Sequence, residues 1–293
     1  QAQIENPRLT AEASGTVGQG VTDLEATVNA GDLRFLGNGI RGAVNAQGHV
    51  TDEGGVRQIT ATGNANGLAV GQAQVDPLLA GATSFDLAAS QSNSGSSVQR
   101  LQVNNPQVQL SAQGDPASGL DIQGRLADMG LILPELPGPA TVNGTLRESG
   151  PNVIADLDIT APGPTRISVN GSAARDFSTT DLAINGNTEA RLANPFLRTR
   201  SIEGPVALDL RLNGAPSLAA LSGQVRWQNG GVAEPGLGIR LEQVDVTAGL
   251  QGGRIQLDGG ANVSAGGRLT ISGPVDLTGG TMDIGVVLDR VVA

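Results

Sequence analysis

The strongest constraint on the fold is a strict alternation of apolar and polar residues, clearest in the segment 204–277. Val206, Leu208, Leu210 and Leu212 alternate with Ala207, Asp209, Arg211 and Asn213, and a second alternating run begins near Val225 and Trp227. Successive side chains of a β-strand point to opposite faces, so a period of two predicts strands with one apolar and one polar face. The pattern therefore raises the question of what covers so many apolar faces.

One change of phase interrupts this segment. Ile239 and Leu241 occupy odd positions, whereas Val244 and Val246 occupy even ones. An extra residue in one strand returns the following side chains to the original face. We therefore expect a β-bulge near residues 242–243.

The rest of the chain repeats the alternation in shorter runs, among them 16–28 and 33–35, which predict strands. Three breaks combine proline with apolar residues, at 76–81, 129–139 and 192–197, and predict short helical turns. The total is roughly 15 to 20 strands with few helices.

Four Asn-Gly pairs each follow an apolar residue, at 143–144, 170–171, 185–186 and 213–214. Asn and Gly tolerate the left-handed backbone that tight hairpin turns require. We therefore expect these pairs to mark turns between strands.

Composition favours a thin layer over a thick globular interior. The chain has 293 residues, of which 43 are Gly and only 2% are aromatic, although aromatic side chains supply much of the volume of compact cores. A long sheet that folds lengthwise into a trough, with its apolar face inside, is one solution. The net charge of −10 disfavours nucleic acid as a partner, because an acidic chain repels phosphates.

Signals for catalysis are weak. His49 is the only histidine and cysteine is absent, so a catalytic triad or a histidine-bridged metal site lacks partners. The segment 37–42 matches a dinucleotide-binding glycine pattern, but a strand and a turn follow it in place of the required helix. Asp156 and Asp158 share a strand face that reads as a solvated acidic surface and not as a calcium site. We expect no enzymatic activity, no cofactor and no metal.

Two outcomes remain for the apolar faces. They pack against each other as a closed core, which the residues alone favour, or they line a groove that holds an apolar ligand. Acyl chains suit such a groove, because each buried methylene contributes about 0.8 kcal/mol and needs no polar partner. Trp227 is expected to be buried, with anchoring of a ligand as the alternative.

Several short motifs follow one another in a specific order. They are Gly204-Pro205-Val206-Ala207-Leu208-Asp209-Leu210, Leu212-Asn213-Gly214-Ala215-Pro216, Leu221-Ser222-Gly223, Glu234-Pro235-Gly236, and Gly266-Gly267 before Leu269-Thr270-Ile271-Ser272-Gly273. Looser similarity extends over most of the chain and includes Asp76-Pro77-Leu78-Leu79 and Asn194-Pro195-Phe196-Leu197. On these motifs the sequence resembles the periplasmic C-terminal half of the TamB family, the translocation and assembly module subunit of Gram-negative bacteria within the AsmA-like bridge lipid-transfer superfamily.

The resemblance implies an all-β fold, an elongated, folded single sheet that forms a taco-like trough with an apolar interior and very few short helical turns. Residues 1–293 are then expected to form one elongated, repetitive trough, with the family-like motifs most frequent at 204–277. The chain is expected to be a fragment that lacks the family's N-terminal membrane anchor and extreme C-terminal segment. The residues expected to face lipid in the groove are Val206, Leu208, Leu210, Leu212, Val225, Trp227, Leu241, Val244, Val246, Ile255, Leu257, Leu269, Ile271, Val275 and Leu277.

The implied function is a periplasmic conduit that carries phospholipid acyl chains between the inner and outer membranes in outer-membrane biogenesis. The implied partners are phospholipid and, through a segment outside this chain, the outer-membrane barrel protein TamA. One alternative is a chaperone-like or structural module that offers sheet edges to outer-membrane β-barrel proteins during assembly or secretion. Another alternative is a closed parallel β-helix of the adhesin type.

Overall fold

The computed structural model describes residues 1–18, 21–37, 39–197, 200–236 and 238–291. Strands make up 69% of the chain and helical turns 7%, which confirms the all-β prediction. The chain divides into two compact units, residues 1–149 and 150–293, and each is described by itself. The expectation of one trough over the whole chain stays a prediction.

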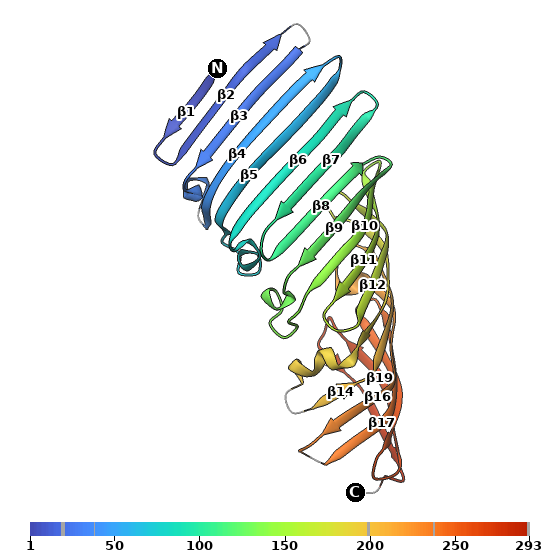
Figure 1. Ribbon diagram of the computed structural model, residues 1–293. Helices are drawn as coiled ribbons and strands as arrows, with labels where there is room; N and C mark the ends of the chain where they lie inside the picture. The colour runs from blue at the N-terminus through green and yellow to red at the C-terminus, as the bar shows by residue number, and fades with distance from the viewer. Residues whose placement is uncertain (19–20, 38, 198–199, 237, 292–293) are drawn as a thin grey trace. The chain divides into compact units, whose positions relative to one another are not determined.

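The first unit is an antiparallel meander in which every strand pairs with the next one along the chain. In Figure 1 these strands, coloured blue to green, run side by side as a single layer. Its strands are β1 (Ala2–Asn6), β2 (Leu9–Gly18), β3 (Val21–Ala30), β4 (Ile40–Glu53), β5 (Val56–Val70), β6 (Ala82–Ser92), β7 (Gly95–Asn104), β8 (Val108–Asp115), β9 (Gly119–Leu126) and β10 (Ala140–Ser149).

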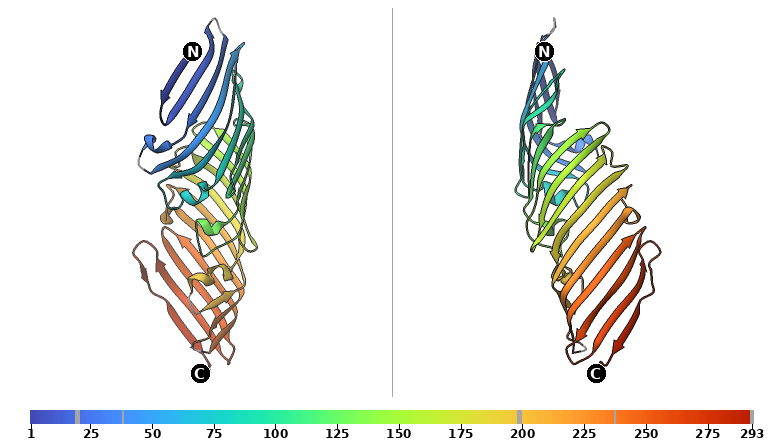
Figure 2. Two further views of the ribbon diagram at one scale, coloured as in Figure 1. Left: turned by 60° about the vertical axis from the view of Figure 1, so that its left-hand side comes forward. Right: turned by 90° about the vertical axis from the view of Figure 1, so that its right-hand side faces the viewer.

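The second unit is also an open antiparallel sheet, seen face-on in orange and red in the right-hand view of Figure 2. Its strands are β11 (Asn152–Ala161), β12 (Thr165–Ala174), β13 (Thr180–Glu189), β14 (Ser201–Glu203), β15 (Pro205–Gly214), β16 (Leu221–Glu234), β17 (Ile239–Gln251), β18 (Arg254–Val263), β19 (Arg268–Asp276), β20 (Thr281–Met282) and β21 (Gly285–Asp289). The long strand β16 pairs with β15 through its first half and with β14 near its end. Both β20 and β21 pair with β19.

All strand pairings recorded within the two units are antiparallel. A parallel β-helix winds its strands in one direction, so this alternative from the sequence is wrong. The described residues form 21 strands, slightly more than the sequence pattern predicts. The excess comes from short strands such as β14 and β20.

Short 3-10 turns form at each of the three predicted breaks. These are η2 (Asp76–Leu79), η3 (Met129–Leu131) and η4 (Ala190–Phe196), and a further turn, η5 (Leu218–Ala220), precedes β16. In η3 the Asp128 carboxylate closes the turn, because its Oδ1 accepts hydrogen bonds from the backbone N–H groups of Gly130 and Gly138 at 2.9 and 2.8 Å. Proline and a local carboxylate therefore explain why the alternation stops here.

Two strand predictions in the first unit are wrong. The run 33–35 is part of a 3-10 turn, η1 (Leu33–Leu36), because Asp32 caps it through the backbone N–H of Arg34 and also holds the Arg34 guanidinium at 2.6 Å. The run 16–28 is divided between β2 and β3, and residues 19–20 between these strands lie outside the described part. The sequence analysis treated this run as one strand, whereas the structure pairs its two parts with each other.

The Asn-Gly pairs do not mark hairpin turns. Those at 143–144, 170–171 and 185–186 lie inside strands, and the pair 213–214 ends β15. Gly171 shows the reason, since its φ is +142° and a Cβ there would overlap the carbonyl oxygen of Asp181 on β13. Glycine therefore serves close approach of neighbouring strands at this position, with Asn170 on the polar face.

The interior of the described part is small and aliphatic. Its buried apolar residues are Ala30, Ala65, Ala112, Ala190, Val244 and Ala261. No large side chain of the described residues is fully buried. The closed core that the residues alone favour is therefore not found in this part of the chain, where each sheet is a single layer.

Candidate functional site

The predicted groove residues lie together on one face of the second unit, called here the apolar face of unit 2. Directly opposite residues of antiparallel strands point to the same side of a sheet. Leu210 lies between Ile184 of β13 and Gly223 of β16, and Leu257 lies between Ala248 of β17 and Gly273 of β19. The same register connects every predicted residue that lies within a strand. Leu277 follows the end of β19 and is the exception.

A β-bulge in β17 keeps this face continuous, as the phase change predicts. The register shifts between Glu242 and Asp245, and Gln243 takes a left-handed φ of +49°. Leu241 then faces Val263, while Val244 faces Gly230 of β16. The extra residue therefore places both side chains on the apolar face.

Trp227 covers a gap in the apolar face that two glycines leave open. A Cβ on Gly230 would overlap its indole ring, and a Cβ on Gly204 would lie 3.1 Å from its Nε1. The indole N–H donates to the carbonyl oxygen of Glu203 in β14 at 3.0 Å. Trp227 therefore links β16 to β14 by a hydrogen bond and also presents a half-buried aromatic surface.

Burial distinguishes this face from an ordinary core. Val244 is buried, with 4% of its surface exposed, Leu277 is exposed at 36%, and the other predicted residues are half-buried. Large aliphatic side chains in a two-layer protein are mostly buried completely. The apolar face of unit 2 thus retains accessible hydrocarbon surface.

The first unit has an equivalent apolar face, which the predicted site omits. Its members include Leu24, Val50, Ile59, Leu87 and Leu101, which the register places on the same side of the sheet across β3 to β7. The signal was present in the sequence as the same alternation. It was weaker because alanine and glycine occupy many intervening positions, as at Ala26, Gly48 and Ala61.

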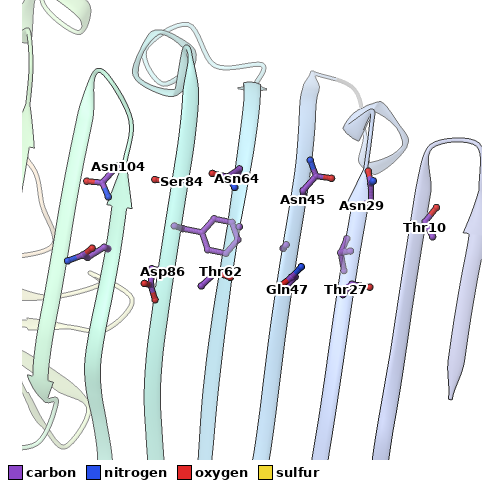
Figure 3. A pocket seen from close by; sticks show the side chains of 15 residues that line it. Thr10, Thr27, Asn29, Asn45, Gln47, Thr62, Asn64, Ser84, Asp86 and Asn104 are labelled. Carbon is purple, nitrogen blue, oxygen red and sulfur yellow. The ribbon is translucent and has the colours of Figure 1, made fainter.

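The opposite, polar face of unit 1 is hollowed. One cavity there has a volume of about 670 Å³, and most residues that line it belong to this face. Figure 3 shows their side chains in two rows across the strands. Two further hollows of about 360 and 380 Å³ extend along β7 to β10. Sequence reasoning missed these cavities, because it treated the polar faces as solvated surface.

A charged hollow of about 440 Å³ lies at one end of unit 2. Arg191 and Arg240 line it together with Glu189, Glu203 and Glu242. Arg240 lies 3.7 Å from Glu203 and 3.8 Å from Glu242, so its charge is already balanced. The excess of carboxylates gives this hollow no preference for anions.

The residues considered for catalysis do not form a site. His49 pairs with Asp23 on the exposed polar face, with 2.7 Å between Nε2 and Oδ1. Asp156 accepts a hydrogen bond from the Asn170 amide at 2.5 Å. No group of three or more metal-binding side chains occurs among the described residues. The glycine pattern at 37–42 runs into β4 and not into a helix, with Asn38 outside the described part.

Hydrogen bonds in turns and ion pairs between strands account for the carboxylates whose pKa is lowered. Hydrogen bonds from the backbone N–H of Gly279 and the hydroxyl of Thr278 lower the pKa of Asp276 to about 2. The Arg211 guanidinium lowers the pKa of Asp181 by hydrogen bonds of 2.8 Å across β13 and β15. These shifts keep the carboxylates ionised, and they stabilise the sheet without indicating acid–base chemistry.

Comparisons with known proteins give no further assignment. No family model, no curated protein and no solved structure matches the chain. Among the described residues, no helical segment has the length and apolarity needed to span a membrane. The resemblance to the TamB family, which comes from the sequence motifs, therefore stays a prediction.

Proposed function

We propose that the chain is a non-enzymatic segment of a lipid conduit, in which acyl chains lie on the apolar faces of the sheets. The observation that carries the proposal is the uncovered hydrocarbon surface of unit 2. Leu208, Leu210 and Leu212 are only half-buried although they occupy the middle of a sheet with strands on both sides. A ligand that covered them would gain about 25 cal/mol for each Å² of apolar surface removed from water.

Saturated or unsaturated acyl chains fit this surface better than a polar ligand does. The side chains across β13, β15 and β16 on this face are aliphatic, apart from Trp227, the hydroxyls of Thr180 and Thr188, and Glu234 at the end of β16, which pairs with Arg200. They offer almost no hydrogen-bond partner to a sugar, a peptide group or a phosphate. An acyl chain needs none, and it can slide because no directional contact holds it at one position.

The polarity of the two faces would restrict acyl chains to one side of the sheet. The residues between the leucines of β15 are Asp209 and Arg211, whose side chains are exposed on the polar face. The acyl chains would move along the apolar face while the headgroup stays in water at the edge of the sheet. The resemblance to the TamB family extends the proposal to the periplasm, between the inner and outer membranes, and to TamA as a partner of segments outside this chain.

The single tryptophan provides a direct test. The chain has one Trp and no Tyr, so its indole fluorescence comes from the apolar face of unit 2. Phospholipids brominated on the acyl chain should quench Trp227. The matched variant Trp227→Phe/Arg226→Trp moves the indole to the polar face of the same strand and should be quenched much less. Equal quenching of both proteins would refute the assignment of the face.

Crosslinking and transfer measurements complete the test. Photo-crosslinkers at Leu208 and Leu210 should capture phospholipid, whereas those at Asp209 and Arg211 should not. Leu210→Arg should block lipid transfer between vesicles without unfolding the sheet, since a charge on the acyl path opposes passage of hydrocarbon. Gln224→Arg, on the polar face of the adjacent strand, is the control. Transfer at the wild-type rate in Leu210→Arg would contradict the conduit.

The free edges of the sheets favour a second candidate, the chaperone-like module. Strand β21 pairs only with β19 among the described strands, and Val286, Val287 and Leu288 are exposed. A strand of an unfolded barrel protein could pair with such an edge. This candidate predicts that Val287→Pro abolishes client binding and that Leu210→Arg is tolerated, the opposite of the conduit.

A further inference from the structure

The polar face of unit 1 carries two ordered rows of hydrogen-bonding side chains. The strand register places Thr10, Asn29, Asn45, Asn64, Ser84 and Asn104 directly across from one another, from β2 to β7. A second row contains Thr27, Gln47, Thr62, Asp86 and Gln102, from β3 to β7. Figure 3 shows both rows along the cavity of about 670 Å³. The face is therefore an array of amides and hydroxyls, and not a random polar surface.

These groups are free to bind a ligand. Asn29, Asn45 and Asn64 are exposed, and no side-chain hydrogen bond to another described residue engages their amides. The one ionised side chain lining the cavity is Asp86, and the Arg100 guanidinium lies 2.9 Å from its Oδ2. The cavity thus offers many neutral donors and acceptors and almost no net charge.

We propose that this face binds a linear, uncharged polyhydroxyl chain, that is, a glycan. Carboxamides and hydroxyls both donate and accept, which matches the hydroxyl groups of a sugar. A nucleic acid requires several unpaired cations, whereas the lining of this cavity includes none and the smaller hollows add only Arg100, which pairs with Asp86, and Arg125. A peptide strand requires an open sheet edge, whereas the backbones of β4, β5 and β6 are already paired on both sides.

The hollows of the polar face of unit 1 are continuous, so they could hold an extended glycan. The two hollows along β7 to β10 share Gln102 with the cavity of about 670 Å³, and one of them also shares Asn104, so the lining continues from β2 to β10. Neighbouring strands are about 4.8 Å apart, which is close to the length that one pyranose ring adds to an extended glycan. Successive sugars can therefore meet equivalent side chains on successive strands.

The mode of binding follows from what the rows contain. They include no aromatic ring on which a sugar could stack, so each sugar is held by hydrogen bonds alone, which are weak in water. Many weak contacts along one chain add up, because the first contact holds the next sugar close to its partners. Affinity is therefore expected to rise steeply with the number of sugars.

The experiment measures binding of neutral oligosaccharides to the full chain by calorimetry. Chitohexaose and cellohexaose are the probes, with N-acetylglucosamine, glucose, a disordered peptide and phosphatidylcholine vesicles as comparisons. Asn45→Ala/Asn64→Ala removes the centre of the first row. Asn185→Ala/Asn187→Ala removes two exposed amides from the polar face of unit 2 and is the matched control. Circular dichroism checks that both variants keep the fold.

The proposal expects a hexasaccharide to bind at least tenfold more tightly than its monosaccharide. It also expects Asn45→Ala/Asn64→Ala to weaken binding about tenfold and the control to leave it unchanged. Absence of binding by both hexasaccharides at millimolar concentration would overturn it. Equal binding of the hexasaccharides by both variants would also overturn it. A third refuting result is that the hexasaccharides do not bind, whereas the peptide or the vesicles bind and lose this binding in Asn45→Ala/Asn64→Ala.

Discussion

Glycines inside the strands are predicted to be essential where neighbouring backbones approach closely. The most informative change is Gly171→Ala in β12. The new Cβ would overlap the Asp181 carbonyl oxygen, lie 3.0 Å from the Cα of Leu182, and require an alanine at a φ of +142°. The Asp181 carbonyl oxygen and the Leu182 Cα are both backbone atoms, so rotation of a side chain cannot relieve the overlap.

The expected cost combines two effects. An L-residue in this region of backbone space costs about 1–3 kcal/mol, and overpacking costs about 1–3 kcal/mol more. The free energy of unfolding should therefore fall by about 2–6 kcal/mol in all. With a slope of about 2 kcal/mol per molar urea, the unfolding midpoint should fall by at least about 1 M.

Gly249→Ala in β17 is the matched control. Beyond the adjacent residues of the chain, no atom lies closer than 3.9 Å to the position that the new methyl group would take, and the φ of Gly249 is not left-handed, so the alanine should fit. Gly249→Ala should raise the free energy of unfolding by about 0.4–1 kcal/mol, because alanine lowers the conformational entropy of the unfolded chain. Urea unfolding followed by Trp227 fluorescence reports on the unit that contains both sites. A wild-type midpoint for Gly171→Ala would refute this explanation of the Asn-Gly pairs.

Three further predictions concern turns. Phe177 is 68% exposed at a φ of +56°, so Phe177→Asn should raise stability by about 0.5–1 kcal/mol in urea unfolding; an unchanged midpoint would contradict it. Asp276, with a folded-state pKa of about 2, stabilises the fold fully above the unfolded pKa of about 3.9, and this contribution is lost as pH falls towards 2. Asp276→Ala should therefore show a smaller fall in urea midpoint from pH 5 to pH 2 than the wild type, and parallel pH profiles would argue against this. Asp128→Ala should speed amide hydrogen exchange at Gly130 and Gly138, while exchange at Gly171 serves as the unchanged reference.

The sequence predicts the fold class well because alternation is a local property. Leu208, Leu210 and Leu212 share a face for the same reason that any strand places every second residue on one side. The bulge at Gln243 was also predictable, because a bulge leaves a trace in the phase of the pattern. The common face of the predicted site residues followed from these two facts.

The remaining features depend on partners far along the chain. Asn-Gly reads as a turn in isolation, but Gly171 is required by the carbonyl of Asp181 on the next strand. The run 33–35 alternates like a strand, yet the Asp32 carboxylate holds it as a turn. The rows on the polar face were missed because Asn29, Asn45 and Asn64 are separated along the chain and become neighbours only through the register.

In the described part of unit 1 each strand pairs with its neighbours in sequence, and this has a consequence for how such a sheet changes over time. Because the pairing is between consecutive strands, one hairpin can be added or removed with both faces kept in phase. Each hairpin changes the path across the strands by about 9.6 Å, twice the spacing between neighbours. The length of either surface can therefore vary in fixed steps while its chemistry stays the same.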